Sequence, residues 1–295
     1  MMIADLAQEL YAERPQDTLY HYTSLNGVMG IVESGSLRAT DIRFFNDAAE
    51  MKHAADLLRT VIAQREEAGT SNPRLLVQLR EWLSHRLTDG HMLYVACFTA
   101  NGNLLSQWRS YCPTAKGVSL GFDATKVFTS ATQQSFQVGR CVYDGEAQRK
   151  IAATILDAIE DIARERGENS DPSKRHPSQS FHGVFEEIEA DLLRMAALLK
   201  HPAFHEEQEW RAVSSVTTNY VAAPIEYREG RSMLVPFMNF RLPEADDRHL
   251  DIEHVCLGPT PNVNNSMTSL SRYLSKKGVS PRRGLAYCQI PYRAW

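Results

Sequence analysis

Strand-like and helix-like segments alternate irregularly along these 295 residues, and this irregularity constrains the fold more than any other feature. Short apolar or alternating segments typical of strands cover residues 18–23, 91–99 and 117–122, and more of them follow residue 208. The helical patterns between them lack the regular spacing that repeated strand–helix–strand units of a parallel sheet require. We therefore expect an α+β fold, with a mixed or mainly antiparallel β core and surrounding helices.

The last third of the chain is the richest in strand patterns. The strands predicted there cover 209–217, 224–228, 232–240, 252–257 and 285–290, with one helix over 262–278. Near the N-terminus, Ser24 is expected to cap a short helix that Gly35 ends. The polar, Pro- and Ser-rich stretch 167–180 predicts a loop, and a single domain is expected over 1–295.

Composition excludes several classes of protein. The chain is 43% hydrophobic and carries a formal charge of −4, which argues against a protein that grips nucleic acid over a broad basic surface. Its five cysteines are odd in number and form no CxxC pair, so neither a disulfide framework nor a zinc knot is expected. No apolar run reaches transmembrane length, and residues 1–15 are acidic and amphipathic. We expect a reduced, cytoplasmic protein without a membrane partner.

Polar side chains gather in a few short clusters, although phosphate-loop, dinucleotide-binding, GxSxG and HExxH signatures are absent. The clusters are His21-Tyr22-Thr23-Ser24, Ser106-Gln107-Trp108-Arg109-Ser110-Tyr111, Glu207-Gln208-Glu209-Trp210-Arg211, and Arg228 with Arg231. Each also has a purely structural explanation. The histidine could be a core residue, the tryptophans packing anchors, and Asp47 with Glu50 a capping box.

The acidic pair Glu207 and Glu209 stands where a predicted strand begins. Side chains two residues apart on a strand point to the same face, so both carboxylates are expected together, with Gln208 on the opposite face. In a purely structural explanation, Arg211 could pair with either Glu in a surface ion pair of little energetic value. The structural alternative is an exposed strand edge whose solvated charges prevent aggregation.

A series of motifs resembles the bacterial domain of unknown function numbered 2971 (DUF2971), in order over nearly the whole chain. The matching segments are "LYHYTS", "GIVESGSLRATDIRFFNDAAE", "ACFTANGNLLSQWRSYCPTAKGVSLGFD", "VYDGE", "HEEQEWR", "RSMLVPF", "VCLGPTPN" and "CQIPYR".

The order of these motifs is also similar to that of NAD-dependent ADP-ribosyltransferases of the DarT-like kind, which modify nucleic acid. Those enzymes have a first strand with a His-aromatic or Arg motif, a central strand with Ser or Tyr, and a late Glu-x-Glu or Gln-x-Glu. The corresponding residues here are His21, then Tyr111 or Ser119, then Glu207 and Glu209. The segment "SQWRSYC" departs from that pattern. The resemblance implies a β core of ADP-ribosyltransferase type.

This resemblance also implies that NAD is the substrate and that ADP-ribose passes to a nucleic acid or a protein. Cleavage of the nicotinamide–ribose bond develops oxocarbenium character, which a carboxylate stabilises. Glu209 would be that carboxylate, Glu207 would act on the acceptor, and His21 would bind the ribose or adenosine part of NAD. A chain of this kind is expected to be a toxin or phage-defence effector with an antitoxin or another regulatory protein as partner.

The remaining NAD contacts implied by the resemblance come from donors, aromatic rings and guanidinium groups. Thr23 and Ser24 would donate hydrogen bonds, Tyr22 or Tyr111 would stack on nicotinamide, and Arg109 with Arg231 would bind the pyrophosphate. His21 and Tyr22 alternate on a strand, so we expect only one of the two to face the pocket.

Other functions stay open on the sequence. Water as acceptor would make the chain an NAD glycohydrolase. His21, Asp47, Glu50, Glu207 and Glu209 offer ligands for a metal-dependent nuclease or phosphodiesterase, although no metal-ligand motif is present and no metal is expected in the favoured interpretation. A non-catalytic nucleotide sensor could use the same pocket for binding alone.

Overall fold

The fold is α+β, as predicted, and its sheet of ten strands is open and mainly antiparallel. The structure is a computed structural model that describes residues 3–15, 17–45, 49–112, 116–166, 181–230, 232–246 and 249–290. The predicted loop at 167–180 and the predicted capping residue Asp47 lie outside the described residues.

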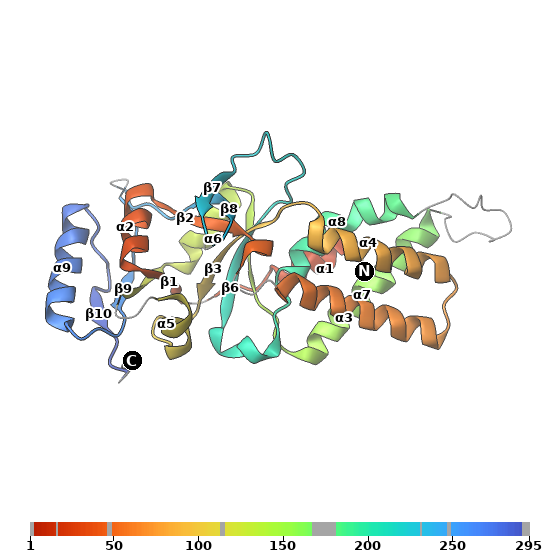
Figure 1. The fold of residues 1–295 in the computed structure, drawn as a ribbon, viewed down its shortest axis with the longest axis horizontal. Coiled ribbons are helices and arrows are strands. Elements are labelled where there is room, and N and C mark those ends of the chain that lie inside the picture. Colours follow the sequence, from red (N-terminus) through yellow and green to blue (C-terminus); the bar gives the residue numbers. More distant parts are fainter. Residues whose placement is uncertain are drawn as a thin grey trace.

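Ten strands form the sheet, and nine α-helices and two 3₁₀ helices complete the described chain (Figure 1). The strands are β1 Leu19–Ser24, β2 Ser36–Asp41, β3 Tyr94–Thr99, β4 Gly117–Phe122, β5 Phe136–Arg140, β6 Glu209–Ser214, β7 Glu226–Glu229, β8 Leu234–Arg241, β9 His254–Leu257 and β10 Leu285–Tyr287. The helices are α1 Ile3–Leu10, α2 Leu25–Ser34, α3 Ala49–Ala68, α4 Pro73–Asp89, α5 Leu105–Tyr111, α6 Ala124–Gln133, α7 Gly145–Glu165, α8 His182–Ala196 and α9 Val263–Lys276, and the 3₁₀ helices are η1 Ile42–Phe44 and η3 Pro202–Glu207.

The sheet forks at β3. One edge of β3 pairs with β6 along Val95–Thr99. The other edge pairs with β1 only at Thr99 and with β2 only at Tyr94 and Val95. Within the described residues, 96–98 therefore have no strand partner on that edge. From this fork one arm continues through β1, β4, β9 and β10, and another through β2, β8 and β7.

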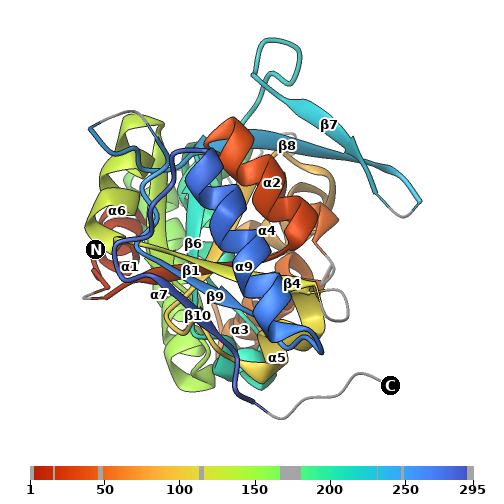
Figure 2. The same ribbon diagram turned by 90° about the vertical axis from the view of Figure 1, so that its left-hand side faces the viewer.

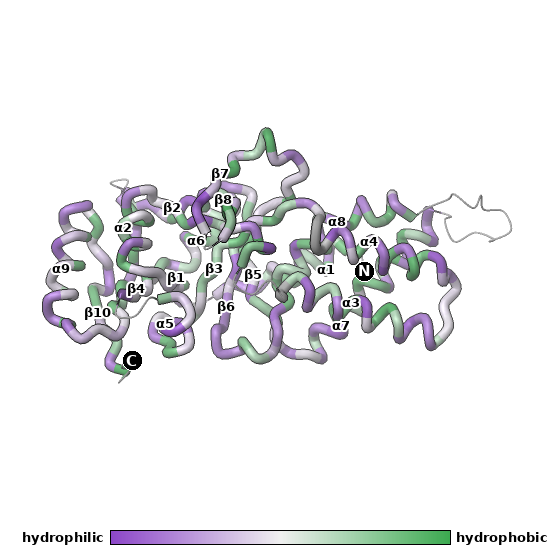
Figure 3. Tube along the Cα trace, in the orientation of Figure 1, coloured by the Kyte–Doolittle hydropathy of each residue, from purple (hydrophilic) through white to green (hydrophobic). Residues whose placement is uncertain are grey.

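Two hydrophobic cores lie on opposite faces of the sheet. On one face α1, α3, α4, α7 and α8 form a bundle that packs against Val95 of β3 and Val213 of β6. On the other face α2, α6 and α9 cover Ala96, Phe98 and Ala212. Figure 3 shows hydrophilic and hydrophobic stretches alternating along the bundle helices, as expected of helices with one buried face.

The hairpin of β7 and β8 forms the end of the second arm, and Figure 2 shows it projecting from the body. In the same view α2 and α9 lie side by side, and Lys277, the residue after α9, pairs with Glu33 of α2 at 3.1 Å. No helix in the described ranges has both the length and the apolar character that a membrane crossing needs.

Candidate functional site

A cavity of about 630 Å³ opens at the fork of the sheet. Its walls come from β1, β2, β3, α5, η3, β6 and β7, so residues distant in the sequence meet there. The cavity brings together five predicted site residues, namely His21, Tyr22, Tyr111, Glu207 and Glu209. Its volume lies within the range of about 300–1,000 Å³ that small-molecule sites in proteins occupy.

The two acids do not lie on one strand, and this prediction was wrong. Glu207 ends the 3₁₀ helix η3, and β6 begins only at Glu209. Gln208 between them is left-handed, with φ 43° and ψ 47°, so the alternation of a strand does not apply across it. The carboxylates nevertheless converge, because both bind the same cation.

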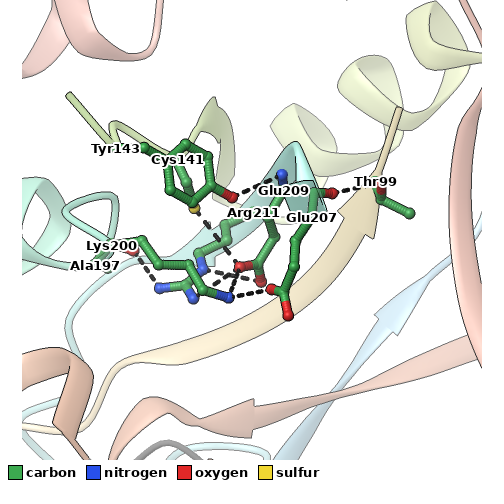
Figure 4. A network of polar contacts seen from close by, with 8 residues as sticks. All are labelled: Thr99, Cys141, Tyr143, Ala197, Lys200, Glu207, Glu209 and Arg211. Atoms are coloured by element: carbon green, nitrogen blue, oxygen red, sulfur yellow. Dashed lines mark hydrogen bonds and ion pairs between the residues drawn. The ribbon is translucent and has the colours of Figure 1, made fainter. Parts of the chain in front are cut away.

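That cation is Lys200, a residue that the motifs did not indicate. Its Nζ lies 2.5 Å from Glu207 Oε2 and 2.5 Å from Glu209 Oε2 (Figure 4). The backbone of Lys200 is fixed as well, since its N–H donates to Val142 and its carbonyl accepts from Gln148 Nε2 at 2.7 Å. The only signal in the sequence was a single lysine that closes the apolar run "MAALLK".

Arg211 is fully buried, so its ion pair with Glu209 is not the surface pair of the structural alternative. Its Nε donates to Glu209 Oε1 at 3.1 Å, its Nη2 to Glu209 Oε2 at 3.0 Å, and its Nη1 to Ala197 O at 2.6 Å. The reason is the position of β6, which pairs with β3 on one edge and β5 on the other. Both oxygens of the Glu209 carboxylate are therefore occupied by charged donors.

The two acids have opposite pKa shifts. Burial alone raises the pKa of Glu209, but the charges of Arg211 and Lys200 outweigh burial and lower the pKa to about 2. Burial raises the pKa of Glu207, and Lys200 offsets only part of that rise. In Figure 4 the second oxygen of Glu207 points away from Lys200. Glu209 therefore stays ionised at neutral pH, whereas Glu207 takes up a proton more readily than Glu209 does.

His21 occupies the gap where β1 and β3 separate. Its Nδ1 lies 2.9 Å from Cys97 O, a carbonyl on the edge of β3 that has no strand partner among the described residues. Burial lowers the pKa of His21, so the ring is neutral at pH 7. Because a carbonyl only accepts, we assign the proton to Nδ1, which leaves Nε2 as an acceptor.

Tyr22 also borders the cavity, so the expectation that only one of His21 and Tyr22 does so was wrong. Its hydroxyl donates to Asn101 O and accepts from Leu104 N, each at 2.8 Å, and its ring packs edge-on against Trp108 at 4.6 Å. Tyr22 thereby holds the start of α5 against β1.

Tyr111 at the end of α5 is the other aromatic residue that was predicted to stack on nicotinamide, and it borders the cavity. Burial and the charges of Glu207 and Glu209 raise the pKa of Tyr111, so its hydroxyl stays protonated at neutral pH.

Other predicted site residues do not border the cavity. Ser24 caps α2 by accepting from Gly27 N at 3.0 Å, and Thr23 lies against Gly27. Ser119 donates to Gly102 O at 2.7 Å. Arg109 is exposed on α5, outside the cavity wall, and Arg231 lies outside the described residues.

The side chains that the metal-dependent alternative would use as ligands do not form a metal site in the described part of the chain. In the described part of the chain, no three His, Cys, Asp or Glu side chains gather in a group that could hold a metal ion. The Lys200 ammonium already occupies the position between Glu207 and Glu209. Asp47 is outside the described residues, and of Glu50 only the backbone is described.

Comparison with known proteins adds one finding. The model of the family described as "Protein of unknown function (DUF2971)" matches residues 107–212, a segment that contains Tyr111, Lys200, Glu207 and Glu209. No curated protein and no solved structure matches the chain. The match confirms the predicted resemblance to DUF2971 over residues 107–212.

Proposed function

We propose that the chain is an NAD-dependent ADP-ribosyltransferase that transfers ADP-ribose from NAD to a nucleic acid or a protein. One observation carries the proposal: a cavity of nucleotide-binding size contains a pair of carboxylates, Glu207 and Glu209, and the neutral imidazole of His21. The order of these residues along the chain resembles that of the ADP-ribosyltransferase motifs. An ADP-ribosyltransferase-like β core is part of the same proposal.

In the proposed reaction the bond between ribose C1′ and nicotinamide breaks, and the bonding electrons leave with nicotinamide. The ribose gains oxocarbenium character, which an adjacent carboxylate stabilises. Glu207 suits this contact better than Glu209, because Lys200 and Arg211 already occupy both oxygens of Glu209. The acceptor then adds to C1′ and loses its proton to Glu207. Glu209 acts through Lys200 as a positioning residue.

The other lining groups suit the two ends of a dinucleotide. Nε2 of the neutral His21 can accept a hydrogen bond from a ribose hydroxyl. Tyr111 presents an aromatic surface beside the acids, where nicotinamide would lie in this arrangement. Water can replace the macromolecular acceptor, which would make hydrolysis of NAD the simplest activity of the site.

The first test is nicotinamide release from NAD, with and without RNA, DNA or cell lysate. Glu207→Gln is expected to lower the rate about 100-fold or more, as loss of a group that stabilises transition-state charge does. Glu206→Gln changes an exposed neighbour on the same 3₁₀ helix and is expected to leave the rate unchanged. Absence of release from folded wild-type protein under every condition would contradict the proposal, and so would full activity of Glu207→Gln.

The proposal includes a role as a toxin or phage-defence effector, because consumption of NAD or modification of nucleic acid would arrest growth. Expression of the wild-type chain is expected to stop growth, while expression of Glu207→Gln is not. A second chain that restores growth with the wild-type enzyme would be the restraining partner.

A nucleotide sensor is the second candidate, because Lys200 binds both Glu207 and Glu209 and neutralises much of their charge. This alternative expects tight binding of nucleotide without release of nicotinamide. The same assay, combined with equilibrium binding, separates the two functions.

A further inference from the structure

Two arginines border the cavity from elements other than those that carry the acids. Arg38 lies on β2 and Arg228 on β7, the two strands that flank β8, and both border the cavity. Between them β8 presents Phe237, and the Arg38 guanidinium lies over the Phe237 ring at 5.1 Å. The aromatic ring provides a platform that orients the guanidinium while leaving its N–H donors available.

Neither of these arginines has an acidic partner in the part of the chain that the structure describes. Among the described residues, Arg43 pairs with Asp41 and Arg211 with Glu209, but no carboxylate comes within 4.0 Å of Arg38 or Arg228. Burial and the charge of Arg38 lower the pKa of Arg228, as expected of two cations that border one cavity. The two like charges repel each other, and a bound anion would reduce that repulsion.

The charges along the cavity indicate which anion fits. Lys200 and Arg211 balance Glu207 and Glu209, so that group sums to zero when all four are ionised. Arg38 and Arg228 add two positive charges to the cavity wall. Glu226, on the same face of β7 as Arg228, accepts from Asn239 at 2.6 Å and offsets one of them, which leaves an excess of positive charge on this part of the wall. A diphosphate ester linking two ribosyl groups carries two negative charges, and guanidinium binds phosphate oxygens in a bidentate manner.

We propose that Arg38 and Arg228 form the binding site for the diphosphate group of a nucleotide ligand. These residues take the role that the sequence pattern suggested for Arg109 and Arg231. The ligand class, a nucleoside diphosphate joined to a second ribose, rests on the proposed function. The anion site itself depends only on the two arginines.

Binding of ADP-ribose to the full chain tests the site, with adenosine as the ligand that lacks phosphate. Arg38→Gln and Arg228→Gln are each expected to weaken ADP-ribose binding about 10- to 100-fold, the effect of losing a charge-assisted hydrogen bond. Adenosine binding is expected to stay unchanged. Arg272→Gln is the matched control. It removes an exposed arginine of α9, a helix that contributes no residue to the cavity wall.

Three further measurements guard the test against folding defects in a variant, the first of them on the wild-type protein alone. Inorganic pyrophosphate is expected to compete with ADP-ribose on the wild-type protein, and added NaCl is expected to weaken wild-type binding more than binding by the double variant. Arg38→Lys and Arg228→Lys, which keep the charge but lose the planar fork, are expected to bind with intermediate affinity. Equal affinity of wild type and double variant for ADP-ribose would overturn the inference, as would failure of the wild type to bind both ADP-ribose and pyrophosphate.

The outcome for this site is distinguishable from the outcome for the proposed activity. ADP-ribose binding that requires both arginines, without any cleavage of NAD, would support the anion site and contradict the transferase proposal. Cleavage of NAD at the wild-type rate and KM by the double variant would support the transferase and overturn the anion site.

Discussion

At the scale of single residues, the buried charges around Glu209 are the most informative feature. Isolated charges are very costly in a protein interior, and they persist there only when paired and hydrogen-bonded. Glu209, Arg211 and Lys200 meet this condition, since each is nearly inaccessible and each contacts an opposite charge. The same contacts that make Glu209 a stable anion also remove its oxygens from contact with a substrate.

Removing the carboxylate from this group is expected to be strongly destabilising. Glu209→Gln should lower the free energy of unfolding by about 3–5 kcal/mol, because Arg211 and Lys200 remain buried with part of their counter-charge lost. Glu206→Gln, on the exposed side of η3, is expected to have little effect. Urea denaturation followed by circular dichroism measures both.

The difference in stability between wild type and Glu209→Gln is expected to depend on pH. The pKa of Glu209 in the folded protein is about 2, below its ordinary value of 4.5, so its ionised form is favoured by folding. This contribution is complete above pH 4.5 and disappears as the pH falls from about 4.5 to about 2. The stability difference between wild type and Glu209→Gln should therefore shrink in that window. A difference that is constant from pH 7 to pH 2 would contradict the assigned ion pairs.

At the scale of elements, helix α2 shows local signals that were read correctly from the sequence. Ser24 accepts from Gly27 N, and Gly35 ends the helix in the left-handed conformation with φ 63°. The Gly35 N–H donates to Ile31 O at 2.8 Å, which satisfies a carbonyl at the end of the helix. Because the helix ends at Gly35, β2 begins at Ser36 and can pair with β3 at the fork.

Two glycines of this segment provide a matched pair for substitution. An added Cβ meets no atom within 4 Å at either Gly30 or Gly35, so packing does not distinguish them. Gly30→Ala lies inside the helix and should raise the free energy of unfolding by about 0.5–1 kcal/mol. Gly35→Ala should lower it by about 1–2 kcal/mol, because an L side chain is strained at positive φ. Changes of the same sign in urea denaturation would contradict the assigned backbone conformations.

At the scale of the whole molecule, the two hydrophobic cores share strands β3 and β6. Val95 and Val213 belong to the core under the helical bundle, whereas Ala96 and Ala212 belong to the core on the opposite face. Because neighbouring residues of one strand serve different cores, loss of one core should disrupt the other. The single domain expected from the sequence stays a prediction, and this arrangement makes it testable.

Thermal unfolding is expected to be one cooperative transition. Leu79→Ala in the bundle core and Phe240→Ala in the opposite core should lower the same midpoint, each variant losing about 2–5 kcal/mol of stability. Calorimetry measures this by comparing the calorimetric and van't Hoff enthalpies, which agree in a two-state transition. Separate transitions that respond to only one substitution each would show that the cores unfold independently.

Local sequence signals predicted helix α2 and the regions of the strands, whereas α6 and the 3₁₀ helices η1 and η3 were not predicted, and α6 and η3 have clear physical causes. Helix α6 contains several Thr residues of modest helix propensity, and it is stabilised by the Asp123 cap on Lys126 N and by burial of Val127 and Ala131. The 3₁₀ helix η3 begins at Pro202, and the His201 side chain caps it by accepting from Ala203 N. The segment before β6 is therefore helical and not extended. Both depend on contacts that a hydrophobic pattern does not reveal.

The site was predicted in part. Glu207, Glu209, His21, Tyr22 and Tyr111 were identified from short polar motifs and do border the cavity. Lys200 belongs to no motif and was missed, whereas Arg38 lies inside a motif segment and Arg228 inside a polar cluster, but neither was given a role. The three cations reach the cavity from separate parts of the chain, which the sequence pattern does not bring together.

The sequence by itself determined the α+β class, the ends of helix α2, the resemblance to DUF2971 and the residue types available for chemistry. Periodicity, capping and motif order are local properties, and they can be read without the fold. Only the tertiary structure decided that β3 pairs incompletely with β1 and β2, that β6 is central, and that Lys200 joins Glu207 to Glu209. These features depend on strand pairing between distant segments, which also sets the burial of each charge and therefore its pKa and its partner.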